Sequence, residues 1–239
     1  MGNIGYTTLT RQAGLMREMQ SVAHNIANAA TTGFRREGLI FAEHVAAVEG
    51  PGGSLSMATA NVRNTDLTQA PLTQTGGRFD FAIEGEGFFL LETPQGERLT
   101  RAGSFTPSAE GELVSPDGYR LLDAGGAPVF VPPDSANVAL SADGTLSADG
   151  RALTQIGLYL PAEPTAMTRA AGTMFDPGGA TDPALNATLV QGFVEQSNVD
   201  PVAEIARMIE VQHAYEMGQG FLDREDERIR NVIRTLGTS

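Results

Sequence analysis

Few residues in this chain of 239 could carry out chemistry. The three histidines, His24, His44 and His213, do not have the spacing of metal ligands. Cysteine and lysine are both absent, which excludes disulfides, thiolate nucleophiles, Schiff-base chemistry and the lysine of a phosphate-binding loop. We therefore expect no cofactor and no metal.

Two carboxylates beside an apolar run, Glu84 and Glu86, could in principle act as a general acid and base. Strand alternation would place both on one face, where solvent surrounds them. The glycines of Glu84-Gly85-Glu86-Gly87 indicate a bend in a strand, and the acidic neighbours would repel a phosphate. This segment is therefore not expected to be catalytic.

The sequence Ser-Ala-Asp-Gly occurs twice, at 141–144 and 147–150, and its aspartates raise the question of calcium binding. A calcium loop of the EF-hand type would need a closing glutamate at its twelfth position, which is missing. Asp-Gly pairs are typical of hairpin turns, and turns explain both copies. The sequence thus predicts a protein that is not an enzyme.

The excess of acidic over basic side chains limits the kinds of molecule that the chain could bind. The chain has 29 acidic and 16 basic side chains, a formal net charge of -13 and a pI near 4.6. This balance argues against binding to nucleic acid or to an anionic membrane surface. No apolar run is long enough for membrane insertion, and residues 1–12 lack the pattern of a cleavable secretory signal. We expect a cytoplasmic protein, or one exported without a cleavable signal peptide.

Helical periodicity marks both ends of the chain. From Thr8 to about Ala30, apolar residues recur every seven positions, and Thr31-Thr32-Gly33 predicts the helix end. At the other end, Asp200-Pro201 predicts a helix start, with Asp200 accepting from free backbone N–H groups. The two stripes and their flanking residues are Leu9, Leu15, Met16, Met19, Val22, Ala23 and Ile26 in the first helix, and Ile205, Met208, Val211, Tyr215, Leu222, Ile229, Val232, Ile233 and Leu236 in the second.

Between the helices, short β-like runs alternate with turn signals, which predicts an antiparallel β domain. The expected fold class is α+β. The expected divisions are an N-terminal helix and signature at 1–36, an irregular connector at 37–64, a central β domain at 65–160, an extended return segment at 161–195 and a C-terminal helix at 196–239.

The two helices are expected to pair as a coiled coil, because an isolated apolar stripe stays uncovered and such a helix is marginal in water. Leu15, Val22, Val211 and Val232 would then face other subunits. Packing of both helices on the β domain would give the same periodicity and stays open as the alternative.

Three ordered motifs carry a resemblance to a known family. Residues 23–36 read Ala-His-Asn-Ile-Ala-Asn-Ala-Ala-Thr-Thr-Gly-Phe-Arg-Arg, and residues 196–201 read Gln-Ser-Asn-Val-Asp-Pro, followed by Gln-His-Ala-Tyr-Glu at 212–216. Between them lie Phe-Asp-Phe-Ala-Ile-Glu-Gly-Glu-Gly-Phe-Phe at 79–89, Thr-Arg-Ala-Gly-Ser-Phe at 100–105 and Gly-Glu-Leu-Val at 111–114. In this order they resemble the flagellar basal-body rod protein family. One departure is His24, where the family pattern usually has asparagine.

The resemblance implies a structural subunit that polymerises into the periplasmic rod, the drive shaft between motor and hook. The implied partners are further copies, other rod proteins and, in transit, the flagellar export apparatus; no small-molecule substrate is implied. The chain length and the opening Leu9-Thr10-Arg11-Gln12 favour a proximal-rod subunit, with a distal-rod subunit as the alternative. A secreted β-rich binding module is a less favoured alternative.

Assembly residues are predicted from the stripes and the motifs together. Asn25 and Asn28 lie about one turn apart, where their amides could bond free carbonyls or a neighbouring subunit. Gly33 ends the helix and Phe34 follows as an aromatic anchor. The predicted assembly interface comprises Leu9, Leu15, Met16, Val22, Asn25, Ile26, Asn28, Gly33, Phe34, Asn198, Met208, Tyr215, Leu222, Ile229 and Leu236.

Overall fold

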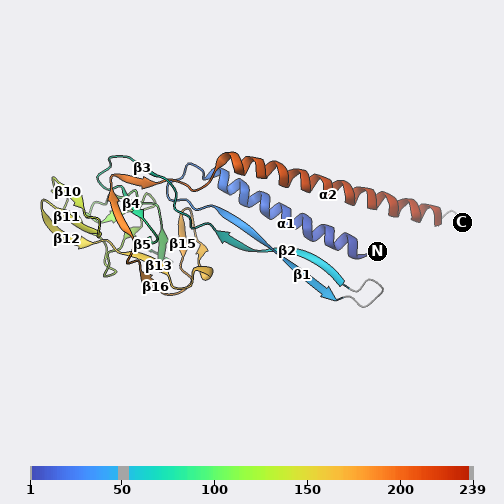
Figure 1. Ribbon diagram of the computed structural model, residues 1–239, viewed down its shortest axis with the longest axis horizontal. Coiled ribbons are helices and arrows are strands. Elements are labelled where there is room, and N and C mark those ends of the chain that lie inside the picture. The colour runs from blue at the N-terminus through green and yellow to red at the C-terminus, as the bar shows by residue number, and fades with distance from the viewer. Residues whose placement is uncertain (1, 48–53, 237–239) are drawn as a thin grey trace. The chain divides into compact units, whose positions relative to one another are not determined.

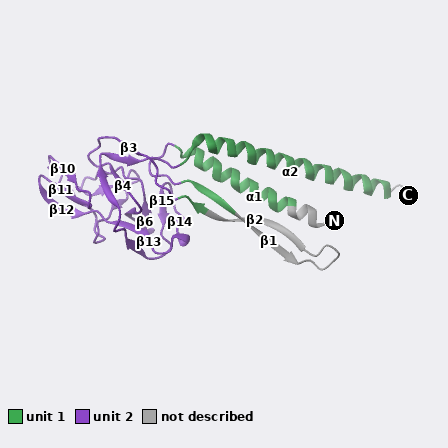
Figure 2. Ribbon diagram, in the orientation of Figure 1, with its two compact units in different colours: residues 1–29, 36–66, 199–239 green, residues 30–35, 67–198 purple. Residues whose placement is uncertain are grey.

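The computed structural model describes the backbone of residues 2–47 and 54–236 and the side chains of residues 8–40 and 64–236. The chain forms two compact units, shown in green and purple in Figure 2. Unit 1 comprises residues 1–29, 36–66 and 199–239, and unit 2 comprises residues 30–35 and 67–198. None of the described helices combines the length and the apolar character that crossing a membrane requires.

Unit 1 consists of two helices and a hairpin: α1 (Gly2–Ala27), β1 (Glu37–Ala47), β2 (Ser54–Thr65) and α2 (Pro201–Leu236). Strands β1 and β2 pair antiparallel from Glu37 opposite Thr65 outward, with a bulge after Ile40. Helix α1 contacts α2 and also both strands (Figure 1). Residues 37–64, expected to be irregular, therefore contain a hairpin. Its packing on α1 is a tertiary contact that composition does not reveal.

The start of α2 is the one that the sequence predicts. The Oδ1 atom of Asp200 accepts hydrogen bonds from the backbone N–H groups of Val202, at 2.9 Å, and Ala203, at 3.2 Å. Pro201 is the first helical residue, where its missing N–H costs nothing. Helix α1 ends at Ala27, and Gly33, with φ of 71°, adopts the left-handed conformation beyond it.

The expected coiled coil is wrong. The described residues contain two α-helices, and the residues that α1 buries are not those of the predicted stripe through Leu9 and Met16. On α1 the heptad residues Leu9 and Met16 are 58% and 43% exposed, whereas the flanking Leu15 and Val22 are buried. Helix α1 divides its buried side between α2 and the β1–β2 hairpin, so its interface is broader than a two-helix seam. Leu15, Val22 and Val211, expected to face other subunits, are instead buried within the chain.

Unit 2 is rich in short antiparallel strands. One sheet follows the order β14-β15-β6-β5-β9-β8-β7, with β13 pairing with both β5 and β16, and a three-stranded sheet follows β10-β11-β12. Strands β17 and β4 form a separate pair, as do β18 and β3. The elements are β3 (Leu72–Gln74), β4 (Phe81–Glu84), β5 (Phe88–Thr93), β6 (Gly96–Thr100), β7 (Thr106–Pro107), β8 (Leu113–Val114), β9 (Arg120–Leu121), β10 (Val138–Leu140), β11 (Thr145–Ala148), β12 (Arg151–Gln155), β13 (Leu158–Pro161), the short 3-10 helix η1 (Pro164–Ala166), β14 (Thr168–Arg169), β15 (Met174–Asp176), β16 (Thr181–Pro183), β17 (Thr188–Gln191) and β18 (Phe193–Glu195).

Residues 161–195, expected as an extended return segment, supply strands to these sheets. β15 pairs with β6, β17 with β4, and β18 with β3, so the segment covers strand edges that would otherwise stay unpaired. In the main core the ring of Phe105 contacts the rings of Phe81 and Phe89, and Leu189 of β17 belongs to the same cluster. The β-rich unit thus extends well past residue 160.

Candidate assembly surface

Asn25 joins three elements of unit 1. Its side chain is fully buried, and its Nδ2 atom donates to the carbonyl of Glu37, at 2.8 Å, and to Oε2 of Glu204, at 3.1 Å. Its Oδ1 atom accepts from the N–H of Glu37 at 2.9 Å. This amide therefore links α1 to β1 and α2, and all its groups are satisfied within the chain. Asn28 differs, since its Nδ2 atom donates to the carbonyl of His24 at the end of its own helix.

The carboxylates beside Asn25 are also buried. Glu204 is 2% exposed, and its Oε1 atom forms an ion pair with Nε of Arg36 at 2.6 Å. Glu37 is 4% exposed, and its Oε2 atom lies 3.6 Å from Nδ1 of His24. Neither carboxylate is among the predicted site residues. The sequence could have indicated that Glu204 faces α1, because its position places it on the side of α2 that carries Val211 and Tyr215.

Polar contacts also fix the register of α1 against α2. Nε of Arg207 donates to Oε1 of Glu18 at 2.8 Å, and this bond raises the pKa of Arg207. Nε2 of Gln12 donates to the carbonyl of Tyr215 at 3.0 Å. Gly218 makes this approach possible, because a Cβ atom there would lie 2.3 Å from Nε2 of Gln12. The two helices therefore run antiparallel, with specific partners along their length.

Helix α2 leaves many large apolar side chains exposed. Met217 is 68% exposed and Phe221 41% exposed, beside a groove of about 370 Å³ that Gln12 and Leu15 of α1 also line. On α1, Leu9 and Met16 are the comparable residues. The exposed large apolar residues of α2 are Val202, Ile205, Ile209, Met217, Phe221, Ile229, Val232, Ile233 and Leu236. A surface of this kind is typical of a protein that buries it against other subunits.

Several of these residues lie outside the heptad on which the predicted interface depends. Val202, Ile205 and Ile209 follow one another by three and four positions, and Met217 and Phe221 by four. This spacing is the signal that could have identified them. A seven-residue repeat selects a single stripe, and α2 carries apolar residues on more than one side.

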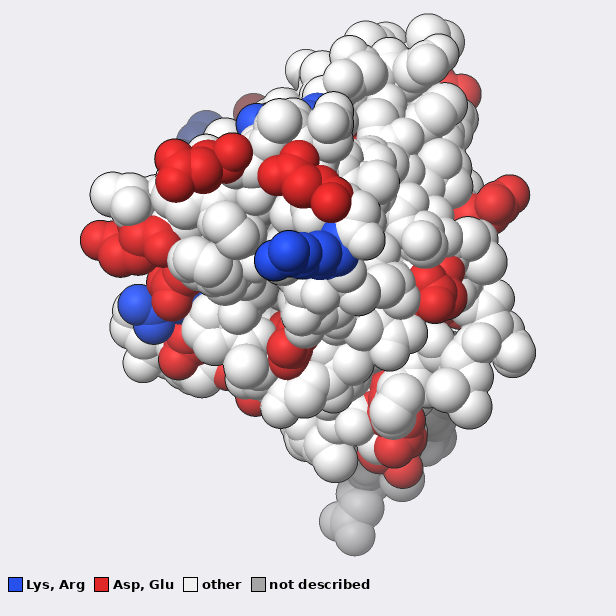
Figure 3. All heavy atoms as spheres, turned by 90° about the vertical axis from the view of Figure 1, so that its left-hand side faces the viewer, with Lys and Arg blue, Asp and Glu red and all other residues white. Residues whose placement is uncertain are grey.

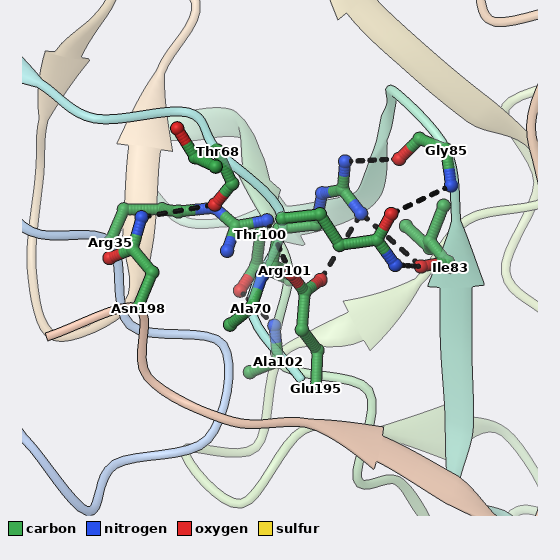
Figure 4. A network of polar contacts seen from close by, with 11 residues as sticks. Arg35, Thr68, Ala70, Ile83, Gly85, Thr100, Arg101, Ala102, Glu195 and Asn198 are labelled. Carbon is green, nitrogen blue, oxygen red and sulfur yellow. Dashed lines mark hydrogen bonds and ion pairs between the residues drawn. The ribbon is translucent and has the colours of Figure 1, made fainter. Parts of the chain in front are cut away.

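A buried ion cluster ties together distant parts of unit 2 (Figure 4). Oε1 of Glu195 lies 2.7 Å from Nη2 of Arg35, and Oε2 lies 3.1 Å from Nη1 of Arg101. The N–H of Ala70 donates to Oε1 of Glu195, and Nη2 of Arg101 donates to the carbonyl of Gly85. All three charged side chains are at most 3% exposed. Burial lowers the pKa of Arg101 to about 10, and the attraction of Glu195 opposes that shift.

The signature residues Gly33 and Phe34 lie beside this cluster. The N–H of Gly33 donates to the carbonyl of Glu195 at 2.8 Å, and a Cβ atom at position 33 would lie 2.2 Å from the nitrogen of Ala102. Phe34 is fully buried, with the guanidinium carbon of Arg169 4.4 Å from its ring centre. Both residues therefore fix residues 30–35 to the β structure of unit 2.

The predicted assembly residues fall into three groups by exposure. Leu9, Met16, Ile229 and Leu236 are exposed and therefore accessible to another subunit. Leu15, Val22, Asn25, Gly33 and Phe34 are buried within the chain. Ile26, Asn28, Asn198, Met208, Tyr215 and Leu222 are half-buried, and Nδ2 of Asn198 donates to the carbonyl of Thr68. In the structure, most of the motif residues therefore contact other parts of the chain, whereas the apolar stripes of the helices are partly exposed to solvent.

The residues considered for chemistry form no reactive arrangement among those described. Glu84 and Glu86 are both exposed. Oδ1 of Asp143 accepts from the N–H of Thr145, and Asp149 has φ of 50° in the turn between β11 and β12. Within the described residues, no three histidine or carboxylate side chains gather as a metal site would require. The aspartates stabilise turns.

The surface charge of unit 2 is unfavourable for contact between copies. Seven arginines stand against sixteen carboxylates in this unit, a net charge of -9. Figure 3 shows more acidic than basic side chains on one face of the molecule. Since like charges repel, this net charge opposes close approach of two copies of unit 2.

Motif residues that bond within the chain, together with two helices that expose large apolar side chains, define a structural subunit built for assembly. Residues 82–148 match the family model described as the flagellar hook protein FlgE/F/G D1 domain, and residues 190–235 match the model of the flagellar basal body rod FlgEFG protein C-terminal region. The chain is 38% identical to the flagellar basal-body rod protein FlgF of Caulobacter vibrioides, over 99% of each chain.

Further relatives agree along nearly the whole chain. The FlgF of Mesorhizobium japonicum is 36% identical, over 98% of this chain and 97% of the relative. The FlgG of Bacillus subtilis is 26% identical, over 95% and 97% respectively. The chain belongs to the flagellar basal-body rod protein family and is similar to FlgF within it. It is therefore a structural subunit of the flagellar basal body that assembles with other rod proteins, and not an enzyme.

Proposed function

We propose that the chain joins the rod through the exposed apolar faces of its two helices. The observation that carries this proposal is the set of large apolar residues on α2, from Val202 to Leu236, whose side chains are between 41% and 76% exposed. Full burial of one such side chain contributes roughly 1.5–3 kcal/mol, so several together supply a strong association energy. Leu9 and Met16 of α1, with Ile229 and Leu236 of α2, then make contacts between subunits.

The buried motif residues have a different role in this proposal. Asn25, Gly33 and Phe34 hold the elements of each unit in place, so that every subunit presents the same helix surfaces. The half-buried Met208, Tyr215 and Leu222 lie on the stripe of α2 and lose their remaining exposure on assembly. Close-packed helices in the assembled rod resist shear, which suits the transmission of torque from motor to hook.

Membership of the family supports a proposal for the location and the export route of the subunit. The subunit passes through the flagellar export apparatus and assembles in the periplasmic part of the basal body. The proximal rod is its proposed position, because FlgF relatives match at higher identity than FlgG relatives. The alternative of a secreted binding module has no support from these relatives.

The test is a gene deletion followed by complementation. Cells without the gene should build a shortened rod with no hook, and the wild-type gene should restore both. Met217→Asp places a charge on the exposed face of α2 and should abolish swimming, whereas Gln219→Asp, also exposed and on the same turn, should not. Both purified variants should unfold at the wild-type urea concentration. Complete hooks in the deleted strain would disprove the proposal.

A further inference from the structure

A groove between the two helices of unit 1 contains a buried polar atom that lacks a partner. Its volume is about 370 Å³. Four residues of each helix line it: Thr8, Arg11, Gln12 and Leu15 of α1, and Ala214, Met217, Gly218 and Phe221 of α2. Gln12 is 6% exposed, and its Oε1 atom accepts no hydrogen bond from the described residues. Because an unpaired buried acceptor costs free energy, a molecule that donates a hydrogen bond to it gains affinity.

The amide of Gln12 is held in one orientation. Its Nε2 atom donates to the carbonyl of Tyr215 at 3.0 Å, so the amide nitrogen is used within the chain and the oxygen is left over. Turning the amide over would bring its oxygen against the carbonyl oxygen of Tyr215, where neither atom can donate. The groove therefore offers a fixed acceptor.

The rest of the lining is mainly apolar and carries one positive charge. Leu15 is buried, whereas Met217 and Phe221 are partly exposed. The ring of Phe221 and the thioether of Met217 both make favourable contacts with an aromatic ring. Arg11 is exposed, and its guanidinium attracts a carboxylate. These features together fit an aromatic acid that also carries a hydrogen-bond donor.

We propose that this groove binds a small aromatic carboxylate whose ring system carries an N–H or O–H donor. The donor bonds Oε1 of Gln12, and the carboxylate faces Arg11. The ring system packs against Leu15, Met217 and Phe221. The volume of the groove is within the range of small-molecule sites. Because the proposed function buries the exposed apolar side chains of α2 between subunits, the site belongs to the unassembled subunit. Binding there goes beyond that function and does not depend on it.

Two ligands that differ by one methyl group test the hydrogen bond. Indole-3-acetate has a ring N–H and a carboxylate, and 1-methylindole-3-acetate lacks only the N–H. Each is titrated into the purified full chain, and binding is followed by the backbone amide NMR signals of Ala214 and Gly218. We expect indole-3-acetate to shift both signals and to bind roughly two- to tenfold more tightly than its methyl analogue. Equal affinities would show that Oε1 of Gln12 accepts no bond from the ligand.

The variant Gln12→Met shows whether the preference for the N–H arises at this residue. Methionine keeps the length of the side chain but lacks the acceptor, so the two ligands should bind the variant alike. The matched control is Gln20→Met, which changes an exposed glutamine of α1 outside the groove and should keep the wild-type preference. Urea denaturation checks that each variant folds. The comparison of the two ligands on the wild-type chain needs no variant.

The variant Arg11→Gln tests the positive charge. It should weaken the binding of indole-3-acetate, and the loss should be smaller for the uncharged indole-3-acetamide. Equal losses for the acid and the amide would contradict the role of Arg11.

Two further results would overturn the inference. Unchanged signals of Ala214 and Gly218 at the solubility limit of indole-3-acetate would exclude binding in the groove. A preference for the N–H ligand that persists in Gln12→Met would place the hydrogen bond elsewhere. Complete hooks in a strain that lacks the gene would contradict the proposed function and leave this binding unaffected.

Discussion

A sequence motif can indicate that a residue forms polar contacts, but it does not indicate which residue it bonds. Asn25 and Asn28 look alike in the sequence, yet one is fully buried between three elements and the other bonds the end of its own helix. The difference depends on Glu37 and Glu204, which approach Asn25 only through folding. Residue type and helix position were predictable, whereas the identity of a partner 179 positions away was not.

Glu195 pairs with two buried arginines, so a change that removes its charge should destabilise the chain. Glu195→Gln keeps the size of the side chain but leaves the buried Arg35 and Arg101 without a carboxylate. Removing one member of a buried ion pair typically costs about 3–5 kcal/mol. We expect a loss of that size in the free energy of unfolding of the purified chain, measured by urea denaturation.

The matched control is Glu92→Gln. Glu92 lies 3.4 Å from Arg120, and both side chains are half exposed. Because solvent screens an exposed pair of this kind, Glu92→Gln should change the free energy of unfolding far less than Glu195→Gln does. Equal losses in the two variants would mean that burial of the cluster around Glu195 does not determine its contribution.

Local sequence signals predicted where the helices lie in the chain. They did not predict which elements the helices pack against. The start of α2 depends on Asp200 and Pro201, which act on neighbouring backbone groups, and that prediction is confirmed. The coiled coil was wrong because α1 has apolar residues on two sides. Periodicity cannot tell which side is buried once a hairpin supplies a second packing surface.

The far part of α2 should be less stable than its middle in the unassembled chain. Around Val211 the helix packs on α1, whereas residues 227–236 have exposed side chains. Exposed short-range ion pairs such as Arg228–Glu225 stabilise a helix only weakly. Backbone amides of residues 227–236 should therefore exchange with deuterium much faster than those of residues 208–216. Equal protection of both segments in a monomer would contradict this expectation.

The whole chain divides into units that are built from discontinuous segments, and this division could not be predicted from the sequence. Residues 30–35 belong to unit 2, although the segments on both sides of them belong to unit 1. Arg35 reaches Glu195 across 160 positions, and no local pattern indicates such a pair. The predicted boundaries follow the chain in order, whereas the units follow contacts between its distant parts.

A fragment experiment tests whether unit 2 needs residues 30–35. A fragment of residues 30–198 keeps the main core, Phe34 and the complete ion cluster, so it should unfold cooperatively in urea. A fragment of residues 67–198 lacks Arg35 and Phe34, which leaves a ring-sized space and breaks the pair with Glu195. Either loss alone typically costs about 3–5 kcal/mol, so the shorter fragment should be less stable by at least about 3 kcal/mol. If both fragments unfold at the same urea concentration, residues 30–35 only rest on unit 2; if the longer one shows no cooperative transition, its core depends on the helices.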